Sequence, residues 1–246
     1  MNLTLKIYRF NPETDTEPHY ECFTIEAEPN ERILDCLNKV RWQKDSSLAF
    51  RMSCAHGICG SDGLVINGQE ALACQKLVKD YDYSKEILIE PLKYFRVFKD
   101  LIVDLTPFYE RLEATNPKTS SAIAKAPPIE EQPQTSQERE DFDDALKCIL
   151  CGCCYSACPV MTEQDQEFIG PAAILRAHRY IFDSRTINTQ ERLKILQKPH
   201  GIWACKSYYM CTLVCPKNIK VTAAIYRTKK RILQEQKTKQ EQEEQK

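Results

Sequence analysis

The residues of this sequence most suited to chemistry are its 13 cysteines, which are gathered in short clumps rather than spread along the chain. The chain begins MNLTLKIY, which alternates as a β-strand does and lacks the basic start and apolar core of a secretory signal peptide. Without such a signal a disulfide framework is not expected, because disulfides persist in oxidising compartments. Clumped thiols in a reducing compartment indicate metal binding.

The first clump reads CAHGICGSD from Cys54 to Asp62 and is followed by Cys74. Its spacing, C-x4-C-x2-D, matches the loop of plant-type 2Fe–2S ferredoxins, except that Asp62 stands where the third cysteine is expected. A carboxylate can ligate iron, although it is a harder donor than a thiolate, so the predicted 2Fe–2S ligands are Cys54, Cys59, Asp62 and Cys74. Small residues let backbone N–H groups reach the cluster sulfides, and the loop supplies Gly57, Gly60, Ser61 and Gly63. The alternatives are a zinc site or buried cysteines without a metal.

Two further runs have the spacing of bacterial ferredoxins. The first follows the pattern C-x2-C-x2-C-x3-C-P and consists of Cys148, Cys151, Cys154, Cys158 and Pro159. The second follows the pattern C-x2-Y-x2-C-x3-C-P and consists of Cys205, Tyr208, Cys211, Cys215 and Pro216. In this arrangement the last cysteine of each run ligates the cluster of the other run.

This exchange of ligands predicts the type of each cluster. One set has four thiolates and predicts a 4Fe–4S cluster held by Cys148, Cys151, Cys154 and Cys215. The other set has three thiolates, because Tyr208 occupies the place of the fourth, and consists of Cys158, Cys205 and Cys211. A cubane that lacks one protein ligand tends to lose that iron, so this set predicts a 3Fe–4S cluster of higher reduction potential. A pair of zinc sites is the alternative, which the two complete C-P endings disfavour.

Three cysteines fall outside these patterns. Cys22 and Cys36 are predicted to pack in the core, from a strand and a helix respectively. Cys153 lies between two ligands but off their spacing, so it is predicted to be buried beside them.

Composition argues against several other functions. Lys+Arg 34 balance Asp+Glu 35, and a net charge of −1 argues against general nucleic-acid binding through phosphate neutralisation. Apolar runs are too short for a membrane-spanning helix. With 7 glycines and no G-x-G-x-x-G or G-x-x-x-x-G-K motif, nucleotide binding is not expected. No catalytic constellation is present, and the four histidines are predicted to be structural or exposed: His19, His56, His178 and His200.

Hydrophobic periodicity predicts an α+β chain with two domains. Strands are expected at 3–7 and 22–25 (a hairpin), 64–66 with a turn at Asn67-Gly68, and 87–89, and a helix capped by Asn30 is expected to run to Trp42. Helices are expected at 141–150, 171–179, 190–196 and 221–236. The predicted domains are 1–107 and 140–236, joined by a segment at 108–139 whose Pro-rich part from Asn116 to Arg139 should be extended and mobile. The tail 237–246 should be solvated and frayed.

The order of these motifs resembles the iron–sulfur subunits of succinate dehydrogenase and fumarate reductase, over residues 1 to about 232. Several segments are similar to that family directly: Leu48–Cys54, Cys59–Gly63, Lys99–Asp104, Phe168–Pro171 and Cys215–Lys217. The resemblance implies an N-terminal β-grasp 2Fe–2S ferredoxin domain and a C-terminal α-helical ferredoxin domain. It also implies a flavoprotein partner that holds FAD, one or more membrane anchor subunits, and quinone as the electron acceptor.

The same resemblance predicts a peripheral location, on the cytoplasmic face of a bacterial or archaeal membrane. The family's tryptophan pair after the first C-P is absent here, and residues 159–167 contain no aromatic side chain. A quinone site beside the 3Fe–4S cluster would then involve Pro159, Glu163, Lys206 and Tyr208, which could equally be ordinary interface residues.

Rival interpretations keep parts of this pattern. The chain could run fumarate reduction instead of succinate oxidation, or serve another oxidoreductase complex of the heterodisulfide-reductase or glycolate-oxidase type. Those complexes typically keep the fourth cysteine that Tyr208 replaces. A free soluble ferredoxin is usually smaller and more acidic than this chain.

Overall fold

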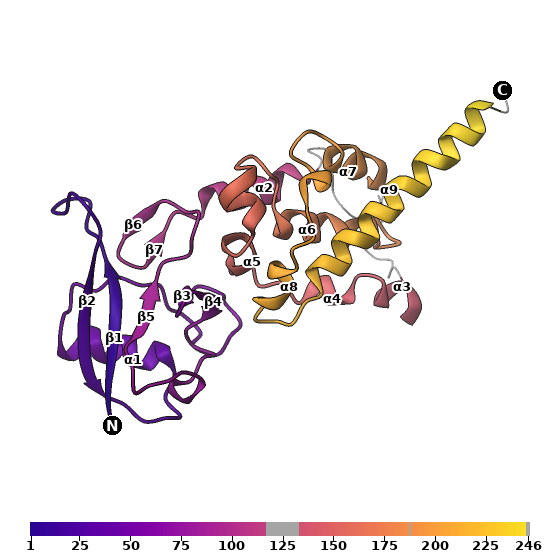
Figure 1. Cartoon of the computed structure of the whole chain (residues 1–246). Coiled ribbons are helices and arrows are strands. Elements are labelled where there is room, and N and C mark those ends of the chain that lie inside the picture. Colours follow the sequence, from indigo (N-terminus) through magenta and orange to yellow (C-terminus); the bar gives the residue numbers. More distant parts are fainter. Residues whose placement is uncertain (117–132, 187, 245–246) are drawn as a thin grey trace, which may run out of the picture. The chain divides into compact units, whose positions relative to one another are not determined.

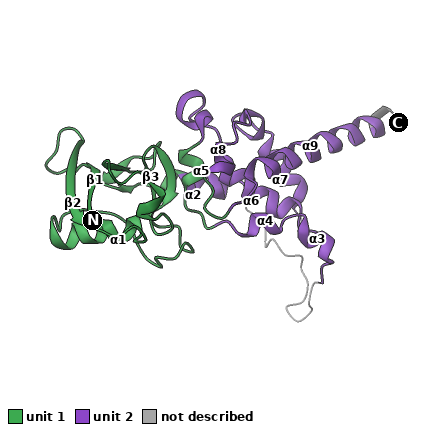
Figure 2. Ribbon diagram, turned by 60° about the horizontal axis from the view of Figure 1, so that its bottom comes forward, with its two compact units in different colours: residues 1–107, 149–157, 214–217 green, residues 108–148, 158–213, 218–246 purple. Residues whose placement is uncertain are grey.

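The computed structural model describes residues 1–116, 133–186 and 188–244 of this 246-residue chain. The chain forms two compact units (Figure 2). Unit 1 consists of Met1–Pro107, Ile149–Ala157 and Val214–Lys217. Unit 2 consists of Phe108–Cys148, Cys158–Leu213 and Asn218–Lys246. Two short segments from the second half of the sequence thus pack with the N-terminal part, and both contain cysteines of the ferredoxin-type runs.

Unit 1 is built on a five-stranded mixed sheet with the strand order β2-β1-β5-β3-β4 (Figure 1). The strands are β1 (Asn2–Arg9), β2 (His19–Glu26), β3 (Gly63–Ile66), β4 (Gln69–Leu72) and β5 (Ile87–Glu90). β1 and β2 form the predicted antiparallel hairpin, and β5 lies parallel to β1. Alternation along β1 buries Leu3, Leu5 and Ile7 completely, which makes this strand the centre of the core. A second small sheet pairs β6 (Val97–Lys99) with β7 (Ile102–Val103).

Helix α1 (Ile33–Gln43) buries its apolar side in the same core, through Ile33, Leu34, Cys36, Leu37 and Val40. The prediction of Asn30 as its N-cap is wrong, because the cap is Arg32, whose N–H donates to the Asp35 carboxylate at 3.2 Å. The side-chain oxygen of Asn30 instead accepts a hydrogen bond from Lys79. The predicted turn at Asn67-Gly68 is confirmed, with φ of 47° and 81°.

Unit 2 is helical, whereas the short helix α5 of the second half belongs to unit 1. The helices beyond α1 are α2 (Thr106–Ala114), α3 (Ser136–Glu140), α4 (Asp143–Leu146), α5 (Cys153–Ser156), α6 (Pro171–Ile181), α7 (Thr189–Leu196), α8 (Met210–Leu213) and α9 (Val221–Glu244). Short 3₁₀ turns cover Val78–Asp80 and Ile202–Ala204, and a π-helical turn covers Val160–Gln164. Helices α6 and α9 pack along each other and bury Ile174, Ala224 and Ile225. The α+β fold class predicted from the sequence is confirmed.

Three predicted elements of the second half need correction or lie outside the description. The expected helix at 141–150 is wrong, because Phe142 leaves helical geometry and only α4 forms before the cysteine run begins. The tail is helical to Glu244 rather than frayed from residue 237, since Lys, Gln and Glu favour helix. Most of the expected mobile linker lies outside the described residues. Its end, however, forms α3, where Thr135 accepts from the Glu138 N–H as an N-cap.

Within the described part of the chain, no helix combines the length and the apolar character that crossing a lipid bilayer requires.

Candidate iron–sulfur centres

The loop after α1 turns its backbone N–H groups toward one thiol. The amides of His56, Ile58 and Cys59 donate to the Cys54 Sγ at 3.5, 3.4 and 3.3 Å. These donors, led by His56, lower the pKa of Cys54 to about 6. The loop therefore favours a thiolate at Cys54, which is the form that binds iron.

Asp62 lies at the far side of this loop with its side chain buried. The Cys74 N–H donates to its Oδ2 at 2.6 Å, whereas its Oδ1 has no hydrogen-bond partner among the described residues. A buried carboxylate oxygen without a partner costs on the order of 1–3 kcal/mol or more. Burial and the neighbouring Asp62 raise the pKa of Cys74 to about 12. A cation between these two groups would relieve both costs, so the donor set fits a bound iron.

Glycine lets this loop turn tightly and approach other backbone. Gly57 and Gly60 have φ of 78° and 69°, in the left-handed region that glycine tolerates. A Cβ on Gly60 would lie 2.9 Å from the Cβ of Cys151, and one on Gly63 would lie 2.9 Å from the Cys151 carbonyl oxygen. The 2Fe–2S loop therefore touches a predicted ligand of the next centre within unit 1.

Three of the four predicted 4Fe–4S ligands lie in unit 1, and the fourth lies at the end of a segment of unit 2. Cys151, Cys154 and Cys215 lie in unit 1, and Cys148 is the residue before its segment begins at Ile149. Cys153 is fully buried beside them, as the sequence predicts. Its S–H donates to Cys151, which lowers the pKa of Cys151 and raises that of Cys153. If Cys151 holds a cluster as predicted, a donor of this kind on its sulfur would raise the reduction potential of that cluster.

The three thiols predicted to hold the 3Fe–4S cluster all belong to unit 2. Cys158, Cys205 and Cys211 line one small cavity. Burial, followed by the charges of Cys158 and Cys205, raises the pKa of Cys211 to about 11. Thr222 lies 3.4 Å from the Cys211 Sγ. The thiolate is the form that binds a metal, and a cationic cluster bound in this cavity would favour it.

Tyr208 lies beside these thiols but its side chain is 49% exposed. Its hydroxyl accepts a hydrogen bond from Gln164 at 2.8 Å. Its neighbours Ser207 and Tyr209 have left-handed φ of 59° and 66°, which costs each about 1–2 kcal/mol. Tyr208 thus lies on the cavity that Cys205 and Cys211 line, but much of its side chain faces solvent.

The predicted quinone residues are only partly gathered. Pro159, Lys206 and Tyr208 line the cavity of the three thiols, whereas exposed Glu163 does not. Sequence reasoning missed Gln164 and Thr222, for which no motif exists.

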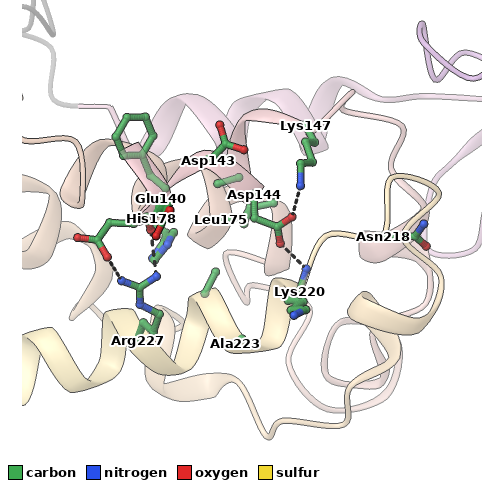
Figure 3. Close-up of a pocket in the computed structure, with 14 residues that line it drawn as sticks. Glu140, Asp143, Asp144, Lys147, Leu175, His178, Asn218, Lys220, Ala223 and Arg227 are labelled. Carbon is green, nitrogen blue, oxygen red and sulfur yellow. Dashed lines mark hydrogen bonds and ion pairs between the residues drawn. The ribbon is translucent and has the colours of Figure 1, made fainter. Parts of the chain in front are cut away.

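A larger cavity of about 560 Å³ opens between α4, α6 and α9 (Figure 3). Its charged side chains are largely paired with each other: Arg227 with Asp141, and Asp144 with Lys147 at 3.0 Å and with the Lys220 N–H at 2.8 Å. No cysteine is among the residues that line it.

Two predictions about individual side chains have clear outcomes. Cys36 is buried in the core, as expected, but Cys22 is exposed and the prediction for it is wrong. Cys22 lies on the outer face of β2, an edge strand whose inward residues are Phe23 and Ile25.

Among the described residues, no three His, Cys, Asp or Glu side chains converge as the ligands of a single metal ion would.

Two parts of the chain match models of known iron–sulfur domain families. Residues 4–110 match the family model of the 2Fe-2S iron-sulfur cluster binding domain, and residues 144–219 match that of the 4Fe-4S dicluster domain. The chain is 37% identical over 235 residues to the succinate dehydrogenase iron-sulfur subunit of Coxiella burnetii, covering 95% of this chain and 98% of that protein.

Further relatives agree with this match. The fumarate reductase iron-sulfur subunit of Haemophilus influenzae is 36% identical, with coverage of 91% and 90%. The mitochondrial succinate dehydrogenase [ubiquinone] iron-sulfur subunit 1 of Oryza sativa is 38% identical, with coverage of 88% and 77%. Among solved structures, the fold is similar to a chain of the Mycobacterium smegmatis Sdh1 complex in the apo form, with a TM-score of 0.86, 25% identity and coverage of 95% and 96%.

Proposed function

Since this chain belongs to the iron–sulfur subunit family of succinate dehydrogenase and fumarate reductase, we propose that it conducts electrons from a flavoprotein subunit to quinone. In this proposal the chain is the electron-transfer subunit of a membrane-bound succinate dehydrogenase, within the tricarboxylic acid cycle and the respiratory chain. The flavoprotein holds FAD and the succinate site, and anchor subunits hold the assembly on the cytoplasmic face of the membrane.

The donor sets described above would hold three centres. The 2Fe–2S cluster would be held by Cys54, Cys59, Asp62 and Cys74. The 4Fe–4S cluster would be held by Cys148, Cys151, Cys154 and Cys215, and the 3Fe–4S cluster by Cys158, Cys205 and Cys211. When bound, the clusters supply one-electron carriers whose potentials depend on ligand type, burial and hydrogen bonds to sulfur. Acid–base chemistry on the dicarboxylate is left to the flavoprotein.

The observation that carries this proposal is the three-thiol site in unit 2. Cys158, Cys205 and Cys211 line one cavity, and the position that would supply a fourth thiolate is Tyr208. A centre with fewer thiolates has a higher potential than a thiolate-rich 4Fe–4S centre. It is therefore suited to the exit end of an electron pathway, next to the acceptor.

Exposed apolar side chains surround this exit. They gather on the segment around α8 and its preceding turn, as Trp203, Tyr208, Tyr209, Met210 and Leu213. Leu213 is 69% exposed and Tyr209 is 61% exposed. So many exposed apolar side chains within one short segment are unusual. We assign this surface to the membrane anchor. Met52, just before the 2Fe–2S loop, and Ile58, within it, are also exposed and suit the flavoprotein side.

A substitution at Lys206 tests the proposed quinone site. It is exposed, adjacent to Cys205 and on the lining of the three-thiol cavity, and its ammonium can donate to a quinone carbonyl oxygen. Losing one donor of that kind costs on the order of 10²-fold in rate. In the membrane-bound complex, K206M should slow succinate:quinone reduction by about that factor while succinate reduction of a soluble dye is unchanged.

The matched control is K198M, which removes an exposed lysine that does not line this cavity. Equal loss of both activities in K206M would indicate misassembly. Unchanged quinone reduction would show that Lys206 is an ordinary interface residue.

Fumarate reduction by the same complex is the second candidate function, because a fumarate reductase subunit is 36% identical to this chain. Measuring both directions with quinone and quinol decides between them.

A further inference from the structure

A buried carboxylate links two parts of unit 1 that are far apart in the sequence. Glu70 lies on β4 and is only 5% exposed. Its Oε1 accepts a hydrogen bond from the hydroxyl of Ser156 on α5 at 2.9 Å. Ser156, which is 1% exposed, in turn accepts from the backbone N–H of Lys93 at 2.8 Å. The Lys93 ammonium approaches the same carboxylate at 4.0 Å.

Each member of this chain of hydrogen bonds depends on the others. The Ser156 hydroxyl has one proton to donate, and because it accepts from Lys93 that proton is directed at Glu70. Without the carboxylate, a buried hydroxyl would lose its acceptor. Without the hydroxyl, a buried carboxylate would keep only the more exposed Lys93 ammonium as a partner, and an unpaired buried charge costs more than a neutral group does.

The two linked elements each lie close in sequence to a proposed cluster ligand. β4 ends at Leu72, two residues before Cys74, a proposed ligand of the 2Fe–2S centre. α5 spans Cys153–Ser156 and contains Cys154, a proposed ligand of the 4Fe–4S centre. The same helix is held by Tyr155, whose ring stacks on that of Phe95 at 5.0 Å between centroids.

We propose that Glu70 is a positioning residue that fixes the ligand helix α5 to the 2Fe–2S domain and lowers the reduction potential of the 4Fe–4S centre. The proposal rests on the function proposed above, because it needs the cluster at Cys151 and Cys154. A buried negative charge stabilises the more positive, oxidised state of a nearby cluster, and poor screening in the interior strengthens the effect. The hydrogen bond to Ser156 holds that charge beside the ligand helix.

The test is a redox titration of the assembled complex, followed by electron paramagnetic resonance, for four variants. E70Q keeps an acceptor for Ser156 but removes the charge. It should raise the 4Fe–4S potential, increasing the reduced-to-oxidised ratio at a fixed potential on the order of tenfold, which is 59 mV for one electron. E70A and S156A should in addition broaden or weaken the 4Fe–4S signal. Q69A, at the exposed neighbour on the same strand, should change nothing.

The outcomes distinguish a failure of the proposed function from a failure of the role proposed for Glu70. If the unsubstituted complex lacks a reduced 4Fe–4S signal, the proposed function itself fails. If that signal is present and E70Q leaves the 4Fe–4S potential unchanged, the role of Glu70 is overturned. The same holds if E70Q shifts the 3Fe–4S potential as much as the 4Fe–4S potential. If E70A does not assemble, E70Q still decides, because it retains the hydrogen bond and changes only the charge.

Discussion

The 2Fe–2S loop of unit 1 and the three-thiol site of unit 2 bring together their proposed iron ligands in different ways. In the loop, Cys54, Cys59 and Asp62 follow one another closely, and glycines and backbone amides do most of the positioning. In unit 2, Cys158 comes from one segment and Cys205 and Cys211 from another. They line one cavity, and Thr222 of α9 lies 3.4 Å from the Cys211 Sγ.

The difference shows where each centre is vulnerable. The loop depends on local backbone conformation, so changes within a few residues should disrupt it. The three-thiol site draws its thiols from two segments far apart in the sequence and contacts α9 through Thr222, while left-handed non-glycine residues occur in both sites, as Ala55 in the loop and as Ser207 and Tyr209 beside the three thiols. Changes to helices distant in sequence should therefore affect the three-thiol site and leave the 2Fe–2S loop intact.

The largest expected effect converts one kind of centre into another. Y208C would restore the fourth thiolate of the Cys158, Cys205 and Cys211 set. The site should then favour a 4Fe–4S cluster of lower potential, and the electron paramagnetic resonance signal of an oxidised 3Fe–4S cluster should disappear. If that signal is already absent from the unsubstituted complex, the assignment of ligands is wrong.

A second substitution tests the local loop at its carboxylate. D62A removes the only non-thiolate donor and leaves an open iron position, so the 2Fe–2S signal should weaken strongly or vanish. D62C should keep the cluster with shifted g-values and potential. An intact and unshifted 2Fe–2S signal in D62A would show that Asp62 only accepts the hydrogen bond from Cys74. Neither variant should alter the three-thiol site.

A third prediction uses two glycines that share a left-handed conformation. Gly60 has φ of 69° and faces the backbone of Cys151, whereas Gly68 has φ of 81° and open space within 4 Å of the position that an alanine Cβ would take. Both alanine variants bear about 1 kcal/mol of conformational strain. G60A also bears a steric clash of about 1–3 kcal/mol, so its total loss in unfolding free energy should be about 3 kcal/mol.

Thermal unfolding of the two variants, compared with the unsubstituted protein, measures this difference. Equal destabilisation of G60A and G68A would show that the close approach to Cys151 is not needed. A weaker 4Fe–4S signal in G60A alone would locate the disturbance at the contact between the two ligand loops.

The sequence predicts the features that depend on residues close together in the chain, and it does not predict those that depend on residues far apart. Short-range spacing predicts Cys54, Cys59 and Cys74 as ligands, and alternation predicts the strand at Ile87–Ile89, which the structure contains as β5. The pairing of Glu70 with Ser156 could not be foreseen, because no motif joins residues so far apart. β4 was missed because its alternation is weak, and Cys22 was misplaced because only the sheet order shows that β2 is an edge strand.

The smallest expected effect concerns a buried histidine that supports the helices behind the three-thiol site. His178 on α6 lies 3.0 Å from the Thr228 hydroxyl on α9, the helix whose Thr222 contacts Cys211. Burial, together with the charge of Arg227, lowers the pKa of His178 to about 4 from 6.5. The native protein therefore binds fewer protons than the unfolded chain between these two values, and stability rises with pH across that window.

This contribution is present above pH 6.5 and is lost as the pH falls toward 4. Between pH 7 and pH 5 the loss should be about 2 kcal/mol, as the difference in pKa implies. H178N keeps a partner for Thr228 without a group that titrates in this range, so its unfolding free energy should vary less with pH than that of the unsubstituted protein. Chemical denaturation at several pH values measures both slopes, and parallel slopes would contradict the assignment. The 2Fe–2S signal should respond equally to pH in the two proteins, because its loop does not depend on α6 or α9.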